Sequence, residues 1–558
     1  MVIKAKQQVV DGRLLKWMLA AGVSWLEHHK AKINNMNVFP VPDGDTGTNM
    51  VLTIRKAYQQ IASVEDLHIG KMSEQIARGA LTGARGNSGT ILSMLLRGFS
   101  QALKDKKEMD AESFALACQS AVDYAYTTVE SVMKPVEGTI LTVARESAAA
   151  IQDLPKTETD LKVVLSQLID AAYTSLENTP NLLPKLKEAG VVDSGGMGLV
   201  YILEGMQRFI NGEPVVLDGV ADATNEEAPD WESSLIPDDE EGYGYDVQFL
   251  MLGENLDVKQ VRQDISDMGW SPLVDGDESL IKVHIHVHNP ADPLDYAIKM
   301  GVDLDDIVVE NMQAQYLQYV QTRHEREHAE EEVKVIDGVA VVTVARGDGL
   351  EALFDEYGAA YVIIGGQTMN PSTEDFLNAI NDIPNQEIIL MPNNSNVIMA
   401  AQQAAGMTQG KTVKVVPSKT VQQGIAALVA YMDANEDGDI NTVFSAMSEA
   451  LGNIVSAEVT TAVRNVNFDG VEVAEGQFIG MLNGKLVTSD ESLDDIVLDL
   501  LNKANSDLYE ICTLYYGDGL KESDAEALAS KLEEHYSDLE YEIVYGGQPL
   551  YPYLISIE

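Results

Sequence analysis

A long acidic segment divides this sequence into parts of different character. Residues 222–244, DATNEEAPDWESSLIPDDEEGYG, contain prolines and many carboxylates but few aliphatic residues, a composition typical of solvated linkers. Because the chain has 558 residues, far more than one ordinary domain, we expect a domain boundary here. The sequence predicts domains at residues 1–212, 243–325 and 333–558, with an acidic linker at 213–242.

The first of these parts is predicted to be wholly helical. Segments rich in Ala and Leu follow one another, and no convincing run alternates apolar and polar residues as a half-buried strand does. The expected helices lie near residues 11–29, 71–83, 88–104, 111–133, 138–152, 159–177 and 195–211. We therefore expect an all-α domain up to residue 212.

Strand signals begin after the linker. YDVQFLML at 245–252 and SLIKVHIHVH at 279–288 flank a helix expected near 257–267, which predicts a small α+β unit. Beyond residue 333, strands such as VAVVTVA and EIILMP alternate with helical stretches, a pattern typical of a parallel α/β sheet. The pattern after about residue 440 leaves the type of the last portion open.

The charge of the chain argues against two classes of partner. With 38 Lys and Arg against 88 Asp and Glu, the formal charge is -50, which repels phosphate backbones and anionic lipid heads. Cys118 and Cys512 are the only cysteines and lie far apart, a usage that fits a reducing compartment. No apolar run reaches the ~18 residues of a membrane span. We expect a cytoplasmic protein that binds no nucleic acid and does not insert stably into membranes.

Two carboxylates stand close together in NVFPVPDGDTGTNM, residues 37–50. Asp43 and Asp45 are separated by one glycine, and two formal charges so close are costly unless a cation lies between them. Mg²⁺ bound to nucleotide phosphates would supply that cation. On local grounds alone, the pair could equally stabilise a Pro-Asp-Gly turn and cap a helix that begins near Thr46.

Two glycine-rich segments precede strong helix signals. They are GARGNSGTILSMLLRG at 83–98 and VVDSGGMGLVYILEG at 191–205. Small residues let backbone amides approach a phosphate, and a helix N-terminus adds partial positive charge. Neither segment is a Walker loop or a dinucleotide fingerprint, and each taken alone could be a plain connection between helices. Together with the Asp turn, they predict one nucleotide site built from helix ends.

In combination these motifs resemble a known family. Residues 1–212 resemble the ATP-binding DhaL or Dak2 domain of dihydroxyacetone kinases. The motifs NVFPVPDGDTGTNM, GARGNSG, KPVEGTILTV, VDSGGMG, GGQTMNPST, PNNSN and GGQPLYPYLISIE together resemble the ATP-binding subunit of the fatty acid kinases of Gram-positive bacteria. The resemblance implies a multidomain fold, in which a helical barrel with Mg-ATP at one rim precedes a small α+β domain and an α/β domain.

The resemblance also implies an activity and partners. The γ-phosphate of ATP would pass to the carboxylate of a fatty acid, giving an acyl phosphate. A separate fatty-acid-binding protein would present the fatty acid and dock on residues 333–558, where GGQTMNPST, PNNSN and Arg464 are candidate contacts. The implied assembly is a homodimer.

The resemblance also implies which residues form the Mg-ATP site. Asp43 and Asp45 are the expected catalytic residues and Mg²⁺ ligands, and Asn37 stands near the place where dihydroxyacetone kinases have a third Asp. The expected contacts to ATP and its metal are Thr46, Gly47, Thr48, Asn49, Gly86, Asn87, Ser88, Gly89, Thr139, Leu141, Asp193, Gly195 and Gly196.

The middle region offers a second metal site. KVHIHVHNP places His284, His286 and His288 at alternate positions of an expected strand, which brings them to one face. Related kinase subunits combine two such histidines with a Cys to hold Zn²⁺, and this chain has Asp246 in place of the Cys. A Zn²⁺ site and a polar strand face without metal remain alternatives.

Two other functions stay open beside the fatty acid kinase. One is a dihydroxyacetone-type sugar kinase, although the chain has no recognisable dihydroxyacetone-binding domain. The other is a non-catalytic nucleotide-sensing scaffold, against which the intact pair of Asp43 and Asp45 argues.

Overall fold

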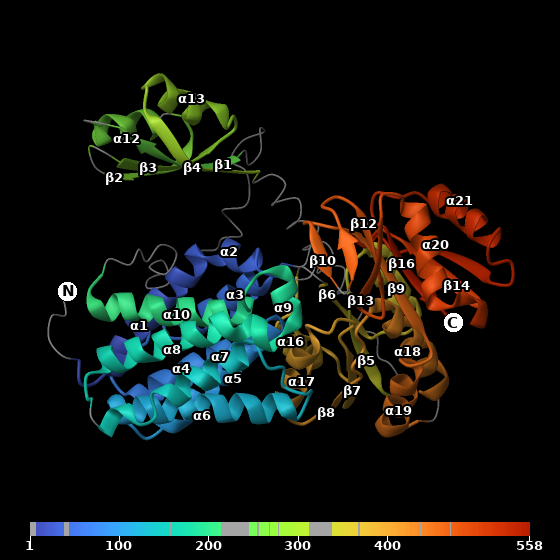
Figure 1. The fold of residues 1–558 in the computed structure, drawn as a ribbon, viewed down its shortest axis with the longest axis horizontal. Coiled ribbons are helices and arrows are strands. Elements are labelled where there is room, and N and C mark those ends of the chain that lie inside the picture. Colours follow the sequence, from blue (N-terminus) through green and yellow to red (C-terminus); the bar gives the residue numbers. More distant parts are fainter. Residues whose placement is uncertain are drawn as a thin grey trace. The chain divides into compact units, whose positions relative to one another are not determined.

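The structure is a computed structural model of the full chain (Figure 1). It describes residues 7–37, 44–156, 158–213, 245–253, 256–266, 268–276, 278, 280–311, 338–366, 369–435, 438–468 and 470–558. The chain divides into two compact units, one formed by Met1–Asn225 together with Lys334–Glu558 and the other by Glu226–Val333. Each unit is described below by itself.

The N-terminal part of the first unit is helical, as predicted. Its helices are α1 (Gly12–His28), α2 (Lys30–Asn34), α3 (Thr46–Gln59), α4 (Ile69–Thr82), α5 (Gly86–Leu103), α6 (Ala111–Glu130), α7 (Ile140–Ala150), α8 (Leu161–Leu182), α9 (Pro184–Ala189) and α10 (Ser194–Asn211). Among all the helices in the described parts of the chain, none is long and apolar enough to cross a membrane.

Short-range signals set the ends of several of these helices. Asp193 precedes α10, and its carboxylate accepts a hydrogen bond from the Gly196 amide at 2.7 Å, which satisfies a free amide of the first turn. The helix ends before Gly212, whose φ of 75° is the left-handed conformation that glycine adopts without strain. Asp110 and Ser113 form a capping box at the start of α6.

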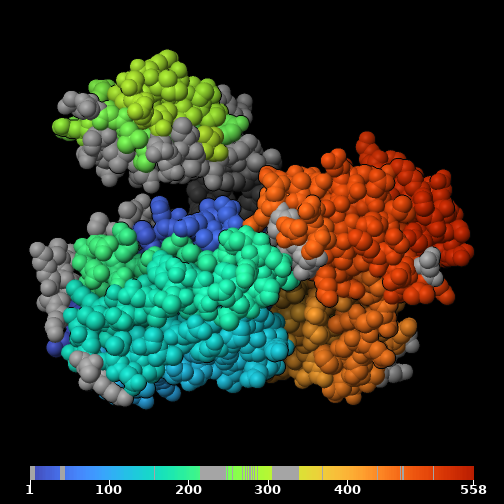
Figure 2. Space-filling view, in the orientation of Figure 1, coloured from blue at the N-terminus to red at the C-terminus, as the bar shows by residue number. Residues whose placement is uncertain are grey.

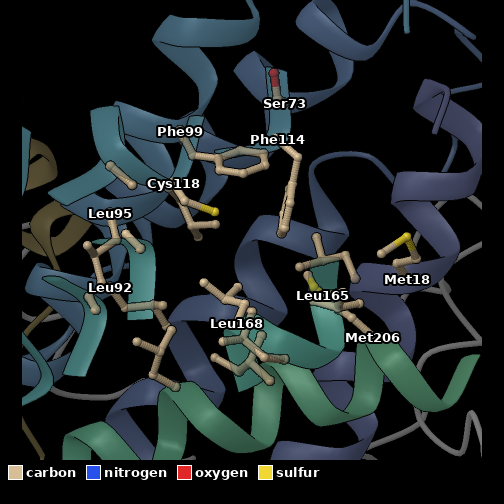
Figure 3. Close-up of a pocket in the computed structure, with 18 of the residues that line it drawn as sticks. Met18, Ser73, Leu92, Leu95, Phe99, Phe114, Cys118, Leu165, Leu168 and Met206 are labelled. Atoms are coloured by element: carbon tan, nitrogen blue, oxygen red, sulfur yellow. The ribbon is translucent and has the colours of Figure 1, made fainter. Parts of the chain in front are cut away.

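An apolar cavity of about 140 Å³ lies inside the helical part (Figure 3). The rings of Phe99 and Phe114 meet there edge to face, with centroids 6.2 Å apart. The Ser73 hydroxyl donates to the Gly70 carbonyl at 3.0 Å, so this polar group is already satisfied. The helices that surround the cavity are seen from outside in Figure 2. The cavity is therefore part of an apolar core.

Residues 338–450 of the first unit form an open parallel sheet with helices on both faces. The strand order is β6-β5-β7-β8, with β5 (Ala340–Ala345), β6 (Tyr361–Ile364), β7 (Glu387–Met391) and β8 (Thr412–Val415) all parallel. One face packs on α16 (Thr373–Asp382) and α17 (Ile398–Met407). The other packs on α15 (Asp348–Glu356), α18 (Val421–Ala434) and α19 (Ile440–Ala450). The α/β prediction is confirmed for this region.

The last part of the chain forms a mixed sheet instead of extending the parallel one. Its order is β13-β12-β9-β16-β14-β15, from β9 (Val455–Thr461), β12 (Phe478–Leu482), β13 (Lys485–Asp490), β14 (Ile511–Tyr516), β15 (Glu540–Tyr545) and β16 (Tyr553–Ile557). Only β14 and β15 pair in parallel, because α21 (Glu522–Glu533) connects them as a crossover. A tight turn with Asn483 and Gly484 at positive φ forces β12 and β13 to be antiparallel.

Two smaller elements complete this part of the chain. Strands β10 (Val466–Phe468) and β11 (Val471–Val473) form a short antiparallel hairpin. Helix α20 (Leu493–Ala504) packs with α21 on one face of the mixed sheet, over a core that includes Ala457 and Val459 of β9. The opposite face of β9 is therefore turned away from these helices.

The second unit is a small α+β fold. Along the chain it contains β1 (Tyr245–Leu252), α12 (Val258–Ser266), β2 (Trp270–Gly276), β3 (Leu280–Val287), α13 (Ala291–Lys299) and β4 (Asp303–Asn311). The four strands are antiparallel in the order β2-β3-β1-β4, which is the ferredoxin-like β-α-β-β-α-β arrangement. Val247, Phe249, Val283 and Ile285 form its core with residues of both helices.

Candidate functional site

The N-termini of three helices meet at one place in the helical part. The Ser194 hydroxyl, at the start of α10, lies 3.3 Å from the Thr46 hydroxyl at the start of α3. A methyl group at Gly195 would lie 3.4 Å from Ile140, the first residue of α7. Because each helix N-terminus carries partial positive charge and free amides, this convergence favours an anion such as a phosphate.

The first turn of α5 adds a fourth N-terminus to the group. Gly86 has a φ of +56°, and a methyl group there would lie 2.5 Å from the Asn49 carboxamide nitrogen of α3. Glycine is therefore required at this position for both its backbone conformation and the close approach of Asn49. Gly89 is required for packing, since a methyl group there would lie 2.3 Å from the Thr53 hydroxyl.

Asp45 lies at the start of α3 and contacts Asn49 and Asn370, which both lie beside Gly86 of α5. It precedes α3 but does not cap it with its side chain. Burial raises the pKa of the Asp45 carboxyl to about 6, although hydrogen bonds from the Asn49 and Asn370 carboxamides favour the ionised form. A buried carboxylate not used for capping is available to a cation or a ligand.

The amides that open α3 already have an acceptor. Asn34 of α2 accepts hydrogen bonds through Oδ1 from the amides of Gly47 and Thr48, at 2.7 and 3.2 Å, and donates to the Thr48 hydroxyl at 3.1 Å. Gly47 and Thr48 therefore lie in the site, but their backbone amides already donate to the Asn34 carboxamide oxygen. Asn37 follows in the turn after α2, where its amide donates to the Asn34 carbonyl at 3.1 Å.

The α/β region contributes side chains to this site from far along the chain. Asn370 donates a hydrogen bond to the Asp45 carboxylate. Arg85, just before α5, donates to the Asn370 carbonyl at 2.9 Å and lies 3.5 Å from the Asp375 carboxylate. Residues of the helical part and of the α/β region, which lie far apart in the sequence, therefore form one site.

A second contact joins the same two regions. The Asn87 carboxamide of α5 donates to Asn396 at 3.0 Å. The carboxamide oxygens of Asn87 and Asn370 are buried and accept no hydrogen bond from any described residue. Buried acceptors without donors are costly, so both oxygens are suited to a ligand, a water or a metal ion.

Three of the expected nucleotide contacts serve the fold directly. Leu141 is buried in the helical core. The Thr139 hydroxyl donates to the Val136 carbonyl at 2.8 Å. Asp193 accepts from the amides of Gly196 and Ile140, while burial raises the pKa of its carboxyl to about 6. These residues hold the first turns of α7 and α10 in place.

The structure brings together most of the predicted nucleotide site. Within the described residues it groups Asp45, Thr46, Asn49, Gly86 and Asn87, with Ser88 in the first turn of α5 and Gly196 in the first turn of α10. Asp43 lies outside the described residues. Whether these residues bind nucleotide stays a prediction.

Sequence analysis missed Asn34 and the role of Asn370. Asn34 lies in a short helix before the motif, and no local pattern marks it as a partner of Gly47. Asn370 belongs to GGQTMNPST, which we expected to face a partner protein, yet Asn370 contacts Asp45 instead. Arg464, expected to face the same partner, donates to the Asn35 carbonyl at 3.2 Å.

The predicted metal site of the middle region is only partly visible. Strand register places Asp246 of β1 opposite His286 of β3, and Gln248 opposite His284. The side chains of Asp246, His284 and His286 lie outside the described residues. Across the described part of the chain, no three His, Cys, Asp or Glu side chains gather as metal ligands. The zinc site stays a prediction.

Three family models match this chain. The DAK2 domain matches residues 40–208. The middle domain of the FakA-like fatty acid kinase proteins matches residues 242–319. The C-terminal domain of the same FakA-like proteins matches residues 340–558.

Curated relatives match along the whole chain. Protein YloV of Bacillus subtilis is 40% identical over 559 residues, which cover 99% of this chain and 100% of that protein. An uncharacterised protein of Staphylococcus epidermidis is 38% identical over 557 residues, covering 98% of this chain and 99% of its own. One from Staphylococcus aureus is 38% identical with the same coverage.

Solved structures show only distant likeness. A fatty acid kinase B3 protein of Streptococcus pneumoniae loaded with linoleic acid is 14% identical, with a TM-score of 0.26, over 34% of this chain and 76% of its own. Dihydroxyacetone kinase of C. freundii is 17% identical, with a TM-score of 0.27, over 35% and 34%. TM-scores this low say nothing about the function of this chain.

Proposed function

Because this chain belongs to the FakA-like family of fatty acid kinase proteins, we propose that it transfers the γ-phosphate of ATP to a fatty acid held by a separate fatty-acid-binding protein. A carboxylate oxygen of the fatty acid attacks the γ-phosphorus, and the bond from that phosphorus to the β–γ bridging oxygen breaks. ADP leaves and an acyl phosphate forms. The DAK2 match to residues 40–208 supports a kinase-type nucleotide site in the helical part.

The observation that carries this proposal is the meeting of four helix N-termini around Asp45. Phosphoryl transfer depends on positioning and on neutralising charge, and needs little covalent chemistry from the protein. The first turns of α5, α7 and α10 bring backbone amides and partial positive charge to the phosphates. We assign Ser88 of α5 to phosphate contact and Gly195 to the lining of the nucleotide pocket. Gly196 serves packing instead, since a methyl group there would lie 2.9 Å from Val143.

The donor atoms around Asp45 fit Mg²⁺. They are the Asp45 carboxylate and the unsatisfied carboxamide oxygen of Asn370, which contacts it, and Mg²⁺ prefers hard oxygen ligands. We assign Asp43 and Asp45 as its protein ligands, and we propose Asn37 as a further neutral oxygen donor. Bound there, Mg²⁺ would neutralise charge on the phosphates. Asn370 orients the Asp45 carboxylate for this purpose.

The α/β region closes the site from a second side. Described residues of GGQTMNPST and PNNSN contact the helical part through Asn370 and Asn396. A fatty-acid-binding protein that delivers the carboxylate to the γ-phosphate must therefore approach beside these segments. We place its docking surface on the α/β region near them.

ATP consumption in the presence of a fatty acid tests the proposal. We expect ADP release that requires both the fatty acid and a fatty-acid-binding protein from the same organism, with the acyl phosphate trapped by hydroxylamine as the hydroxamate. Phosphorylation of dihydroxyacetone instead would identify a sugar kinase. Nucleotide binding without turnover would identify a scaffold. Analytical ultracentrifugation of the same sample tests the expected homodimer.

A further inference from the structure

A small cavity of about 70 Å³ lies at the carboxyl ends of the parallel sheet, apart from the site around Asp45. The chain passes from β5 to β6 on one side and then to β7 on the other side of β5. Arg346, which follows β5, and Pro392 and Asn393, which follow β7, line the cavity. Open α/β sheets bind ligands at such a reversal of strand order.

The mixed sheet supplies the opposite wall. Ala457 and Val459 of β9 pack into the core beneath α20 and α21, so the residue between them, Glu458, is directed to the other face of the strand. Glu458 lines the cavity together with Gln548 and Tyr551 from the loop before β16. The cavity therefore lies between two sheets that belong to one compact unit.

Two acceptors on this wall accept no hydrogen bond from the described part of the chain. The Glu458 side chain is 8% exposed and has no hydrogen bond or ion pair with any described residue. Its burial raises the pKa of its carboxyl to about 7. The Gln548 carboxamide donates to the Tyr515 carbonyl at 2.8 Å, but its oxygen is buried without a partner. A buried acceptor left without a donor destabilises the protein unless a ligand supplies one.

The backbone around the cavity is held in uncommon conformations. Asn393 and Leu550 have φ values of 53° and 70°, and both line the cavity. The Asn393 side chain is fixed by donation to the Thr343 hydroxyl at 2.8 Å and by acceptance from the Ser418 hydroxyl at 2.7 Å. Positive φ is costly for Leu in particular, and such strain gathers at ligand sites.

We propose that this cavity binds a small organic ammonium compound. Its N–H groups would donate to the Glu458 carboxylate, while its carbon atoms would lie against Leu350 and Leu550. A cavity of about 150 Å³ holds the six carbon atoms of benzene, so on that scale this cavity of about 70 Å³ has room for about three non-hydrogen atoms. The carboxylate of a fatty acid would be repelled by the Glu458 carboxylate.

A larger hollow of about 610 Å³ gives the ligand a way in. It shares Glu458 and Tyr551 with the cavity, so the two spaces adjoin at the carboxylate. Thr420 and Asn483 also line it. The ammonium group can therefore reach Glu458 without opening the core.

Calorimetric titration of the full chain with ethanolamine tests the proposal. We expect saturable binding of ethanolamine, and binding at least tenfold weaker for ethylene glycol, which has the same shape without the charge. Glu458→Gln keeps the shape of the side chain and should weaken ethanolamine binding at least tenfold. Glu540→Gln, at an exposed position of β15, is the matched control and should bind as the wild type does.

Several results would overturn the proposal. They are the absence of saturable ethanolamine binding to the wild type, equal binding of ethylene glycol, and undiminished binding to Glu458→Gln. Saturable binding of oleate that Glu458→Gln abolishes would assign the cavity to fatty acids instead. A thermal melt at pH 8 without ligand gives an independent readout. We expect Glu458→Gln to melt higher than the wild type, and a lower melting temperature would show that the carboxylate serves the fold.

Discussion

The Asn370 carboxamide donates a hydrogen bond to the Asp45 carboxylate. Asp45 stands at the start of α3 in the helical part, whereas Asn370 precedes α16 in the α/β region. The contact lies beside Arg85, which donates to the Asn370 carbonyl. A residue of the α/β region thus holds the carboxylate that we assign to Mg²⁺.

The first prediction concerns Asn370. Asn370→Ala removes one of the two carboxamide donors to Asp45 and loosens the carboxylate, so we expect turnover to fall about 10–100-fold, as for other partners of metal ligands. The apparent affinity for Mg²⁺ should fall with it, measured by titrating Mg²⁺ at saturating ATP. Asn381→Ala, at an exposed position of the adjacent helix α16, is the control. Unchanged Mg²⁺ dependence in Asn370→Ala would refute the positioning role.

The second prediction concerns Asp45 itself. Asp45→Asn keeps the size of the side chain but removes the charge that we assign to Mg²⁺, so phosphoryl transfer should fall by about 10²-fold or more. Folding should survive, because the variant also removes a buried charge. Single-turnover ADP formation and a thermal melt measure the two effects. Near-normal turnover would exclude Asp45 as a metal ligand, and Asp105→Asn, at an exposed position, serves as the control.

The third prediction compares two glycines with similar backbone conformations. Gly86 and Gly190 have φ values of +56° and +65°, but only at Gly86 would a methyl group meet a neighbour, the Asn49 carboxamide at 2.5 Å. Gly190→Ala should cost about 1 kcal/mol of unfolding free energy from backbone strain alone. Gly86→Ala should cost more and should also weaken ATP binding. Urea unfolding and nucleotide titration of both variants give the comparison, and equal losses would argue against a special role for Gly86.

The fourth prediction concerns the pH dependence of stability. The pKa of the Glu458 carboxyl is about 7 in the folded chain, against an ordinary value of 4.5. Between these values the folded state holds more protons, so this group makes the wild type less stable as pH rises from about 4.5 to 7. The loss is up to about 3 kcal/mol, from about 1.4 kcal/mol per pKa unit.

Glu458→Gln removes this contribution. Its unfolding free energy should exceed that of the wild type by an amount that grows from pH 5 to pH 7.5, measured by urea unfolding at several pH values. A difference that stays constant over this range would show that Glu458 does not titrate in it.

The fifth prediction concerns zinc in the middle region. Elemental analysis of protein purified without chelator should find up to one equivalent of a transition metal, held by His284, His286 and Asp246. Changing both histidines to alanine should remove the metal and lower the melting temperature of residues 243–325, while ATP binding persists. His535→Ala, at an exposed position, should leave the metal in place. A wild type without metal, whose melting temperature does not respond to added Zn²⁺, would favour the polar strand face.

The sequence by itself determined the features that depend on near neighbours. The helix caps at Asp110 and Asp193 bond within the first turn of the helices that they begin. Short apolar runs that alternate with helical stretches indicated the strands of the parallel sheet. Glycine-rich turns ahead of helices indicated where backbone could approach a phosphate. The combination of motifs also identified the family, because matching motifs requires no knowledge of the distances between residues in the fold.

Only the tertiary structure decided which of these features meet. Asn370 and Asp45 are 325 residues apart, and nothing in either local sequence records that packing brings them together. Glu458 is a second example, because only the packing of two sheets shows that its side chain is buried without a partner among the described residues. The mixed order of the last sheet was likewise hidden, since strand direction depends on long-range connections. Distances between residues, burial and unsatisfied hydrogen-bond acceptors arise when distant segments pack together, so no local sequence pattern predicts them.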